Sequence, residues 1–420
     1  MEPTATKLWN RDFSLLVIGQ VISIFGNMIL SWALPFYVLD ITGSAAMFGL
    51  VLAVPNVSLL IMSPIGGILA DRFRKQRIMF WLDLSATIIV VLYMATSGFF
   101  VEIVPVIMVK LLALNAIQGM YMPAVQSAVP VLVPQDKLVS ANASVGIVNA
   151  LSNTAAPAAA GVLYGNFGLF PILVITAVCL AITAVMDLLI RVPFKKQPAV
   201  GSVAQIIKSD MSLAGKFVVK DKPILAKCAV IMFIFSVTIA ATLLVGLPVL
   251  ITQHLGMEMN MVGVNQSFMM AGGIIGGIAT GALGERMTIQ RAWFPLLLCS
   301  LAIAPIGAVF LFNVPVFAAF VIMTAASTLT LAFIQLCNIQ LMSFIQRETP
   351  TELIGKVMSI LLILPFVANA LGQVLIGVLF EQLSALPWII VFVASAISVA
   401  VTLYSRKHFS NIKSAIEIKP

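Results

Sequence analysis

Two ionisable side chains lie deep inside long apolar segments, where a charge is costly unless it has a partner or a task. Asp83 lies about 9 Å from one end of the segment 78–100, and Lys110 about 10 Å from one end of the segment 103–126. A buried carboxyl group can exchange a proton, and a buried ammonium can bind an anionic group of a ligand. The plainer alternatives are pairing with an arginine of residues 71–77 for Asp83 and extension to the membrane interface for Lys110. We expect the plainer alternative at both positions.

A larger set of candidates consists of asparagine and glutamine side chains within apolar segments. Several recur at spacings of four, seven or eleven residues, which return to nearly the same helix face. An amide that faces lipid is costly, so these side chains are expected to face the protein interior. Any one of them could make an interhelical hydrogen bond. The whole set predicts the polar lining of a central substrate cavity. The predicted cavity residues are Gln20, Asn27, Asn56, Lys110, Asn115, Gln118, Asn149, Asn153, Asn265, Gln335, Asn338, Asn369 and Gln373.

No arrangement typical of an enzyme accompanies these residues. The sequence contains no Gly-Lys-Ser phosphate cradle, no cluster with metal-ligand spacing and no catalytic triad. Its histidines, His254 and His408, are far apart, and its four cysteines lie singly in apolar segments, where they are expected to pack as small apolar residues. We therefore predict no catalytic residue, no metal and no cofactor, in a protein that is not an enzyme.

The elements that position these side chains are membrane-spanning helices. Of the 420 residues, 61% are hydrophobic and 10% are charged, and a soluble fold cannot bury that much apolar surface. The longest uncharged runs can each supply two crossings and contain turn residues near their middles. We predict an all-α membrane protein with twelve transmembrane helices, at 13–39, 46–70, 78–100, 103–126, 143–164, 169–190, 225–251, 261–284, 292–312, 315–341, 356–380 and 386–405.

The distribution of positive charge predicts the orientation of these helices. The net charge is +8, which by itself could indicate a nucleic-acid partner. If the N-terminus lies inside, however, the predicted inner segments hold every one of the 24 Lys and Arg residues except Lys110. This is the positive-inside pattern of membrane proteins. It predicts that both termini are cytoplasmic, that the basic residues meet anionic lipid, and that no nucleic acid is bound.

A polar turn with a defined spacing recurs at half the chain length. Residues 67–72 read Gly-Ile-Leu-Ala-Asp-Arg, and further cations follow up to Arg77. Residues 281–286 read Gly-Ala-Leu-Gly-Glu-Arg, and Arg291 follows Arg77 by 214 residues. Two repeats of six helices with parallel topology are therefore expected, an arrangement in which transporters bind their substrate near the midplane between the repeats.

Glycines outside the turn recur at nearly the same offset. Gly49 and Gly263 open the second predicted helix of each half, and Gly161 and Gly377 lie near the end of the fifth. We predict two pseudo-symmetric bundles at 1–190 and 225–405. A cytoplasmic linker at 191–224, whose apolar residues could lie on the membrane surface or form a flexible connection, joins them, and a cytoplasmic tail follows at 406–420.

The turn at 67–77 resembles the signature loop of the major facilitator superfamily, which reads Gly, any, Leu, Ala, Asp, Arg, any, Gly, Arg, Lys. Arg74 stands where that pattern prefers a second glycine, a departure common in the subgroup similar to bacterial macrolide-efflux and siderophore-export proteins. In the family, the carboxylate at Asp71 docks at the N-terminal end of the eleventh span and holds the cytoplasmic side closed. The resemblance implies a gating set of Gly67, Asp71, Arg72, Arg77, Pro157, Gly161, Glu285, Arg286 and Arg291.

Two further family motifs bear on direction and energy source. The ladder of small residues that ends at Pro157 and Gly161 resembles the motif of exporters, although most of its glycines are replaced by Ala or Ser. The fourth span carries Asn115 where the family pattern has an arginine that is often tied to proton coupling. Asp83 is the remaining candidate for a proton carrier.

The resemblance, with the features above, predicts a secondary transporter. It would export a hydrophobic organic molecule, such as a drug, macrolide or metabolite, by alternating access coupled to protons. The alternative is an importer or uncoupled facilitator of a small metabolite or lipid. The expected location is the inner (plasma) membrane of a bacterium, and the expected partners are a small-molecule substrate, membrane lipid and protons, with the chain as a monomer.

Overall fold

The structure is a computed structural model of the chain, and it describes residues 8–96, 103–192, 215–283, 292–350 and 353–409. Within these ranges the chain is helical and contains no strand. Eleven of the described helices are long and apolar enough to cross a membrane. The remaining predicted crossing is the 30-residue helix α5 (Leu138–Phe167). The prediction of an all-α membrane protein with twelve helical crossings is confirmed.

The first six helices extend beyond most of the predicted ends, and in α1 capping residues set both ends. The Asn10 side chain accepts a hydrogen bond of 2.9 Å from the Phe13 amide, and Gly43 ends the first helix with a positive φ of 61°. The helices are α1 (Arg11–Thr42), α2 (Ala45–Arg72), α3 (Lys75–Thr96), α4 (Ile103–Leu132), α5 and α6 (Leu169–Leu189).

The later helices are less regular. The seventh crossing runs from α8 (Pro223–Phe235) through π-type turns and α9 (Leu247–Val249) to His254. The ninth is interrupted at Ile303, where Pro305 enters the first turn of the following helix. The others are α10 (Met259–Leu283), α11 (Trp293–Ala302), α12 (Ala304–Leu311), α13 (Val316–Glu348), α14 (Ile354–Gln382) and α15 (Pro387–Phe409).

The chain divides into two compact units that nearly follow the predicted halves. The first unit comprises residues 1–43, 50–203 and 258–264, and the second comprises 44–49, 204–257 and 265–420. Each unit thus takes a short segment from the other half of the sequence. Most of the predicted linker lies outside the described residues.

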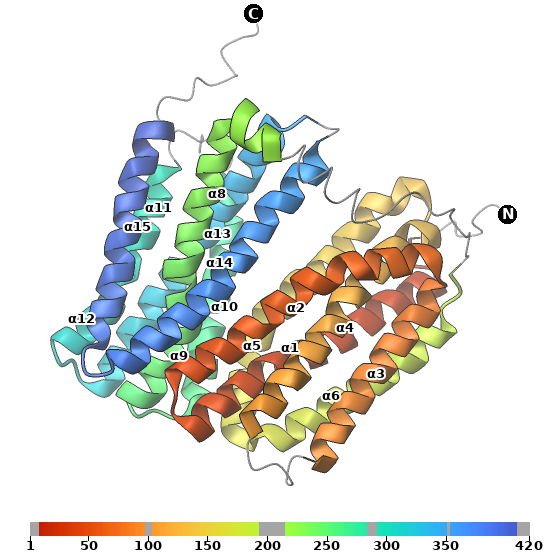
Figure 1. Cartoon of the computed structure of the whole chain (residues 1–420), viewed down its shortest axis with the longest axis horizontal. Coiled ribbons are helices and arrows are strands. Elements are labelled where there is room, and N and C mark those ends of the chain that lie inside the picture. Colours follow the sequence, from red (N-terminus) through yellow and green to blue (C-terminus); the bar gives the residue numbers. More distant parts are fainter. Residues whose placement is uncertain (1–7, 97–102, 193–214, 284–291, 351–352, 410–420) are drawn as a thin grey trace, which may run out of the picture. The chain divides into compact units, whose positions relative to one another are not determined.

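The two units use the same packing order. In the first, α1 packs against α5 and α6, and α3 packs against α4 and α6. In the second, α8 and the turns after it pack against α14 and α15, and α11 packs against α13 and α15 (Figure 1). The packing partners therefore correspond between the units. The seventh crossing packs like the first and the ninth like the third, and the tenth, eleventh and twelfth correspond to the fourth, fifth and sixth. This agreement confirms the two pseudo-symmetric six-helix bundles.

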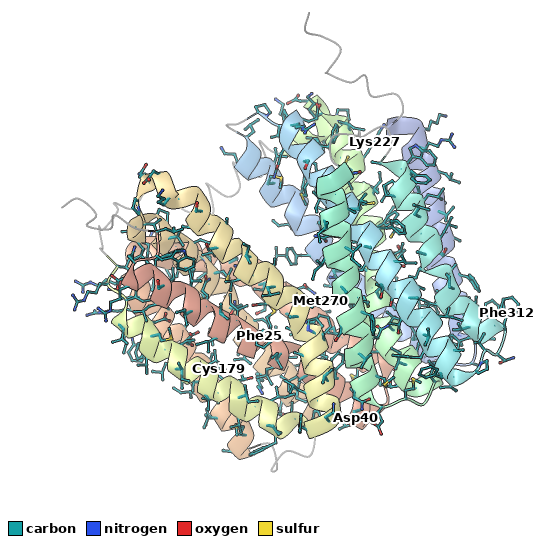
Figure 2. The ribbon with its side chains drawn as sticks, turned by 180° about the vertical axis from the view of Figure 1, so that it is seen from behind. Phe25, Asp40, Cys179, Lys227, Met270 and Phe312 are labelled. Carbon is teal, nitrogen blue, oxygen red and sulfur yellow. The ribbon has the colours of Figure 1, made fainter. Side chains whose placement is uncertain are left out.

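Each bundle has an apolar interior and an apolar exterior. One core cluster joins Phe13 of α1, Met79 of α3 and Tyr121 of α4, and a second joins Leu225 of α8, Leu296 of α11 and Leu341 of α13. Large apolar side chains such as Phe312, at the edge of the second unit, are exposed (Figure 2). Exposed apolar surface on this scale is the surface that faces lipid tails in a membrane protein.

Candidate functional site

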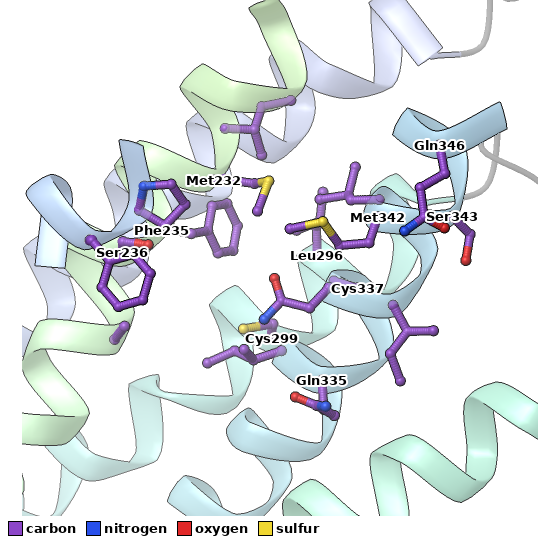
Figure 3. Close-up of a pocket in the computed structure, with 18 residues that line it drawn as sticks. Met232, Phe235, Ser236, Leu296, Cys299, Gln335, Cys337, Met342, Ser343 and Gln346 are labelled. Carbon is purple, nitrogen blue, oxygen red and sulfur yellow. The ribbon is translucent and has the colours of Figure 1, made fainter. Parts of the chain in front are cut away.

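A cavity of about 580 Å³ lies within the second unit, between α8, α11, α13 and α14 (Figure 3). Apolar side chains supply most of its wall, among them Met232, Phe235, Leu296 and Met342. The volume falls within the range of roughly 300–1,000 Å³ that is typical of small-molecule sites. This cavity is the candidate ligand site of the second unit.

The polar groups of the cavity are neutral. Three amides line it, Gln335, Asn338 and Gln346, together with the hydroxyl groups of Ser236 and Ser343. No charged side chain is among the described lining residues. Apolar walls with a few hydrogen-bonding groups can hold and orient an uncharged organic molecule, whereas they offer no counter-charge to an ion.

Part of this lining consists of residues that were predicted for a central cavity between the halves, and that central cavity stays a prediction. Gln335 and Asn338 were among the predicted cavity residues, and both lie here. Gln346 was missed because the tenth span was predicted to end at residue 341, whereas α13 continues to Glu348. Its spacing of eleven residues from Gln335 returns to nearly the same helix face, which is the signal that could have found it.

Asn265, Asn369 and Gln373 do not line this cavity. Asn265 is completely buried in α10, and its amide donates hydrogen bonds of 3.2 Å to Thr324 and Ser327 of α13. It therefore joins two helices within one unit, which is the alternative that the sequence left open for any single amide. Asn369 and Gln373 lie on α14, and the Asn369 Oδ1 atom is buried without a hydrogen-bond partner.

Three predicted cavity amides of the first unit donate hydrogen bonds inside the bundle. Asn27 of α1 donates to Gln118 of α4 at 3.3 Å, and both are buried. Asn115 and Asn149 donate to backbone carbonyls one turn earlier in their own helices. The partly buried Asn56 lies on α2, and the side chain of Asn153 lies outside the described residues. Gln20 is completely buried, and neither polar atom of its amide has a partner.

Lys110 does not extend to the membrane interface, so that expectation was wrong. Its ammonium nitrogen is buried without a hydrogen-bond partner and lies 3.8 Å from the ring centroid of Tyr93 on α3. The face of the aromatic ring attracts the cation electrostatically and does so without a bound water molecule. Lys110 also borders an apolar hollow of about 420 Å³ between α3 and α4.

Asp83 does not pair with an arginine of the 71–77 turn, which corrects the second expectation. Arg72, Arg74 and Arg77 are exposed, whereas Asp83 is buried and accepts a hydrogen bond of 3.3 Å from Ser23 of α1. Asp83 lies about two turns into α3 and faces the bundle. The arginines are exposed to solvent, so they do not approach its carboxylate.

A second buried acid was missed by the sequence analysis. Asp187 of α6 is 2% exposed and interacts electrostatically with Asp83. It follows the uncharged stretch that ends at residue 186, and it lies inside the predicted span 169–190. A carboxyl group within that span was the signal that could have identified it.

Several predicted gating residues lie outside what the structure describes. These are Glu285, Arg286, Arg291 and the side chain of Asp71. The gating role of Gly67 on α2 stays a prediction. The neighbouring Gly66 makes a close contact within the first unit, because a Cβ atom placed there would lie 2.5 Å from the Met120 Cα atom of α4.

Gly161 lies at a close helix crossing within the first unit. A Cβ atom at Gly161 would come within 2.5 Å of the Gly263 Cα atom on α10, and Pro157 is buried one turn earlier in α5. A reciprocal crossing occurs within the second unit, where a Cβ atom at Gly49 would lie 3.3 Å from the Gly377 Cα atom. The four glycines are the repeat-related pairs of the sequence, so the internal symmetry extends to individual contacts.

An acidic side chain caps one of these crossings. The Glu381 carboxylate at the end of α14 accepts hydrogen bonds from the Ser44 hydroxyl and, at 3.0 Å, from the Ala46 amide at the start of α2. An anion at a helix N-terminus meets unsatisfied amide donors and the positive end of the helix dipole. The sequence predicted such a contact for Asp71, at the opposite end of α2.

The structure resembles solved transporters over almost its full length. It matches a mutant of the nucleoside transporter NupG with a TM-score of 0.68 and 16% identity, over 94% of this chain and 98% of that one. It matches a POT family transporter in complex with 5-aminolevulinic acid with a TM-score of 0.67 and 14% identity, over 94% and 95% of the two chains. At these identities the likeness shows a shared fold.

Sequence comparison identifies a relative at low identity and a family. The chain is 26% identical over 191 residues to macrolide efflux protein A of Streptococcus pyogenes, and the same protein from a serotype M6 strain gives the same figures. The match spans 44% of this chain and 46% of the relative, which is less than half the length of either. The model of the Major Facilitator Superfamily matches residues 16–373. With twelve helical crossings in two repeated bundles, the chain belongs to the Major Facilitator Superfamily and is a multi-pass membrane protein.

Proposed function

We propose that this transporter exports a hydrophobic, uncharged organic molecule by alternating access. The observation that carries the proposal is the cavity of about 580 Å³ in the second unit, with its apolar wall, three amides and no described charged lining residue. The 26% identity to macrolide efflux protein A supports a substrate of the drug or macrolide class and the outward direction.

We propose that the proton gradient supplies the energy for export. No phosphate cradle for ATP occurs in the sequence, so a transporter of this family would depend on an ion gradient or on the substrate gradient itself. Asp83 stays the proposed proton carrier, and Asp71 the proposed gating carboxylate. The alternative from the same fold is an importer or uncoupled facilitator of a small metabolite or lipid.

The proposed setting is the plasma membrane of a bacterium, with both termini in the cytoplasm. The distribution of Lys and Arg supports this orientation. In the same setting, the chain acts as a monomer with a small-molecule substrate, protons and membrane lipid as its partners.

Accumulation of a panel of dyes and antibiotics, including macrolides, tests the proposal in cells with and without the protein. We expect lower accumulation of neutral hydrophobic compounds in expressing cells, and loss of the difference when the proton gradient is collapsed. Higher accumulation would contradict export, and export that continues without the gradient would contradict proton coupling.

A matched pair of variants on α13 tests whether the cavity is the site. Asn338→Trp fills the cavity, whereas Leu329→Trp places the same side chain at a position that is 54% exposed and does not line it. We expect transport to fall at least tenfold in the first variant and to stay near wild type in the second, at equal expression. Equal transport by both variants would show that the cavity is not part of the transport pathway.

A further inference from the structure

The hollow of about 420 Å³ between α3 and α4 opens on an apolar surface of the first unit. Two of the side chains that line it, Leu92 and Val109, are 56% and 66% exposed. Exposed apolar side chains on a membrane-spanning helix meet hydrocarbon. The described lining residues of this hollow and of the cavity in the second unit do not overlap, so the two are separate sites.

Lys110 supplies a cation to this hollow. The residue is 4% exposed, and its Nζ atom is buried without a hydrogen-bond partner. The Tyr93 ring, whose centroid lies 3.8 Å from Nζ, attracts the charge, but an ammonium group also carries three N–H donors that require acceptors. Neither of the ion pairs found among the described residues includes Lys110, so no described acid neutralises it. A buried ammonium without a counter-charge is costly.

The hydroxyl group of Tyr93 is a second unpaired donor at the same hollow. Tyr93 lines the hollow and is 5% exposed, and its Oη atom is buried without a hydrogen-bond partner. A buried tyrosine hydroxyl usually finds a partner. The remaining polar side chain of the described lining, Thr96, already donates to the Leu92 carbonyl at 2.7 Å. An ammonium and a hydroxyl that both need an acceptor therefore meet in one apolar hollow, and a single anionic group could satisfy both.

The depth of these donors restricts the kind of anion that can reach them. Lys110 lies about 10 Å along α4 from its first residue, Ile103, at 1.5 Å per residue. An inorganic anion would have to leave water and pass apolar side chains to reach this depth, which is costly. An amphiphile that is already dissolved in the membrane can bring its anionic group there while its hydrocarbon chain stays among apolar side chains.

The size of the hollow favours a ligand with one hydrocarbon chain. Its volume lies near the lower end of the range of roughly 300–1,000 Å³ that is typical of small-molecule sites. A phospholipid carries two chains and a bulky headgroup, whereas a fatty acid carries one chain and a carboxylate. The two oxygen atoms of that carboxylate can accept hydrogen bonds from the Lys110 ammonium and the Tyr93 hydroxyl together.

The second unit provides an internal comparison. At the repeat offset of 214 residues, Gly307 and Thr324 stand in place of Tyr93 and Lys110. They lie on α12 and α13, the pair of helices that corresponds to α3 and α4, and the Thr324 hydroxyl accepts a hydrogen bond of 3.2 Å from Asn265. The fold therefore requires neither a cation nor a tyrosine at these positions, and their presence in the first unit calls for a separate purpose.

We propose that the hollow between α3 and α4 binds a long-chain fatty acid, whose carboxylate pairs with Lys110 and accepts a hydrogen bond from Tyr93. The hydrocarbon chain lies against the apolar wall that includes Leu92 and Val109. The bound carboxylate neutralises the buried ammonium and links two neighbouring helices. This assigns Lys110 to a lipid site instead of the predicted central cavity, and it does not depend on the identity of the transported molecule.

The test is photocrosslinking of the purified full-length protein, in phosphatidylcholine nanodiscs, with palmitate that carries a diazirine in its chain. Mass spectrometry is expected to locate the label on peptides that contain residues 89–96 or 105–113. Unlabelled palmitate should compete, whereas hexadecanol, which has the same chain without a carboxylate, should not. Lys110→Met should lower labelling at these peptides by about tenfold or more, because it removes a charged hydrogen-bond donor. Tyr93→Phe keeps the ring beneath the ammonium and should lower labelling by about threefold.

Matched variants on α4 separate occupation of the hollow from a general effect on the helix. Ala113→Phe fills the hollow, whereas Leu112→Phe places the same side chain at the adjacent position, which is 40% exposed and does not line it. Only the first of these should abolish labelling. Lys137→Met removes a lysine whose side chain is 48% exposed elsewhere in the unit and should leave labelling unchanged.

Three outcomes would overturn the proposal. The first is absence of palmitate-specific labelling at these peptides in the wild type. The second is unchanged labelling in Tyr93→Phe and Ala113→Phe, which both keep Lys110 and so remain informative if Lys110→Met does not fold. The third is competition by phosphatidylglycerol as strong as that by palmitate, which would assign the hollow to a phospholipid phosphate instead of a fatty acid.

Discussion

Individual polar residues inside this protein differ in how their polarity is satisfied. Asn27 donates to Gln118 while its own Oδ1 atom is buried without a partner, and Asn265 donates to two hydroxyl groups of a neighbouring helix. Lys110 uses an aromatic ring, and Gln20 has no partner. Residue type alone therefore does not separate a packing amide from a ligand-binding one, because the difference lies in which neighbours the fold supplies.

The contact between Lys110 and Tyr93 leads to a prediction at this scale. Tyr93→Leu removes the ring beneath a buried ammonium, and we expect a loss of about 2 kcal/mol of unfolding free energy, the value typical of a desolvated cation–π contact. Lys110→Met removes the charge that needs the ring, so Tyr93→Leu should then have a much smaller effect. The unfolding free energies of the wild type, the two single variants and the double variant give the coupling energy between the two residues. Strictly additive effects would contradict the contact.

Pairs of helices in this protein approach closely where glycines face one another. The crossing of α5 with α10 at Gly161 and Gly263 has a repeat-related counterpart at Gly377 and Gly49, and in both cases a Cβ atom would meet backbone. Small residues let helices pack closely in a membrane, where the hydrophobic effect does not drive them together. The start of α2 is further held by the carboxylate of Glu381.

Substitution at the α5 crossing tests its importance at the scale of elements. Gly161→Val introduces a Cβ atom 2.5 Å from the Gly263 Cα atom, so the helices must separate, and we expect transport to fall at least tenfold at normal expression. Gly277→Ala on α10 is the matched control, because a Cβ atom there would meet nothing within 4 Å. Full transport by Gly161→Val in the accumulation assay would show that the close crossing is dispensable.

The whole molecule is organised by duplication. The first and second units repeat the order in which their helices pack, and the repeat reaches single residues at the glycine crossings. The two units nevertheless differ in their polar interiors. One has a pair of buried acids where the other has hydroxyl groups, and the described cavity with amide lining belongs to the second unit. The shared fold thus carries different chemistry in its two copies.

The orientation of the molecule gives a prediction at this largest scale. Because nearly all of the 24 Lys and Arg residues fall in the predicted inner segments, we expect both termini to lie in the cytoplasm. Reporter fusions at the N-terminus and the C-terminus that are active only in the cytoplasm should both give signal. A fusion after residue 43, between α1 and α2, should give none. Signal from that fusion, without signal from the terminal fusions, would show that the topology is the reverse of the predicted one.

The sequence alone determined the membrane class, the helical crossings, their repeat and the family. These properties depend on long apolar runs, on turn residues and on offsets near 214 residues, all of which are local or periodic features. The predicted ends were less accurate, as at α13, because amphipathic ends of helices carry polar residues beyond the apolar core.

Tertiary structure alone decided which polar residues meet. Asp83 and Asp187 are 104 residues apart, as the difference of their numbers shows, and Ser23, which donates to Asp83, lies on a third helix, so no local pattern brings them together. Likewise, Lys110 could reach either the interface or a ring until the packing of α3 against α4 placed Tyr93 beneath it. Helix periodicity gives the face of a residue, whereas the rotation and partner of each helix follow from the packing of the whole bundle.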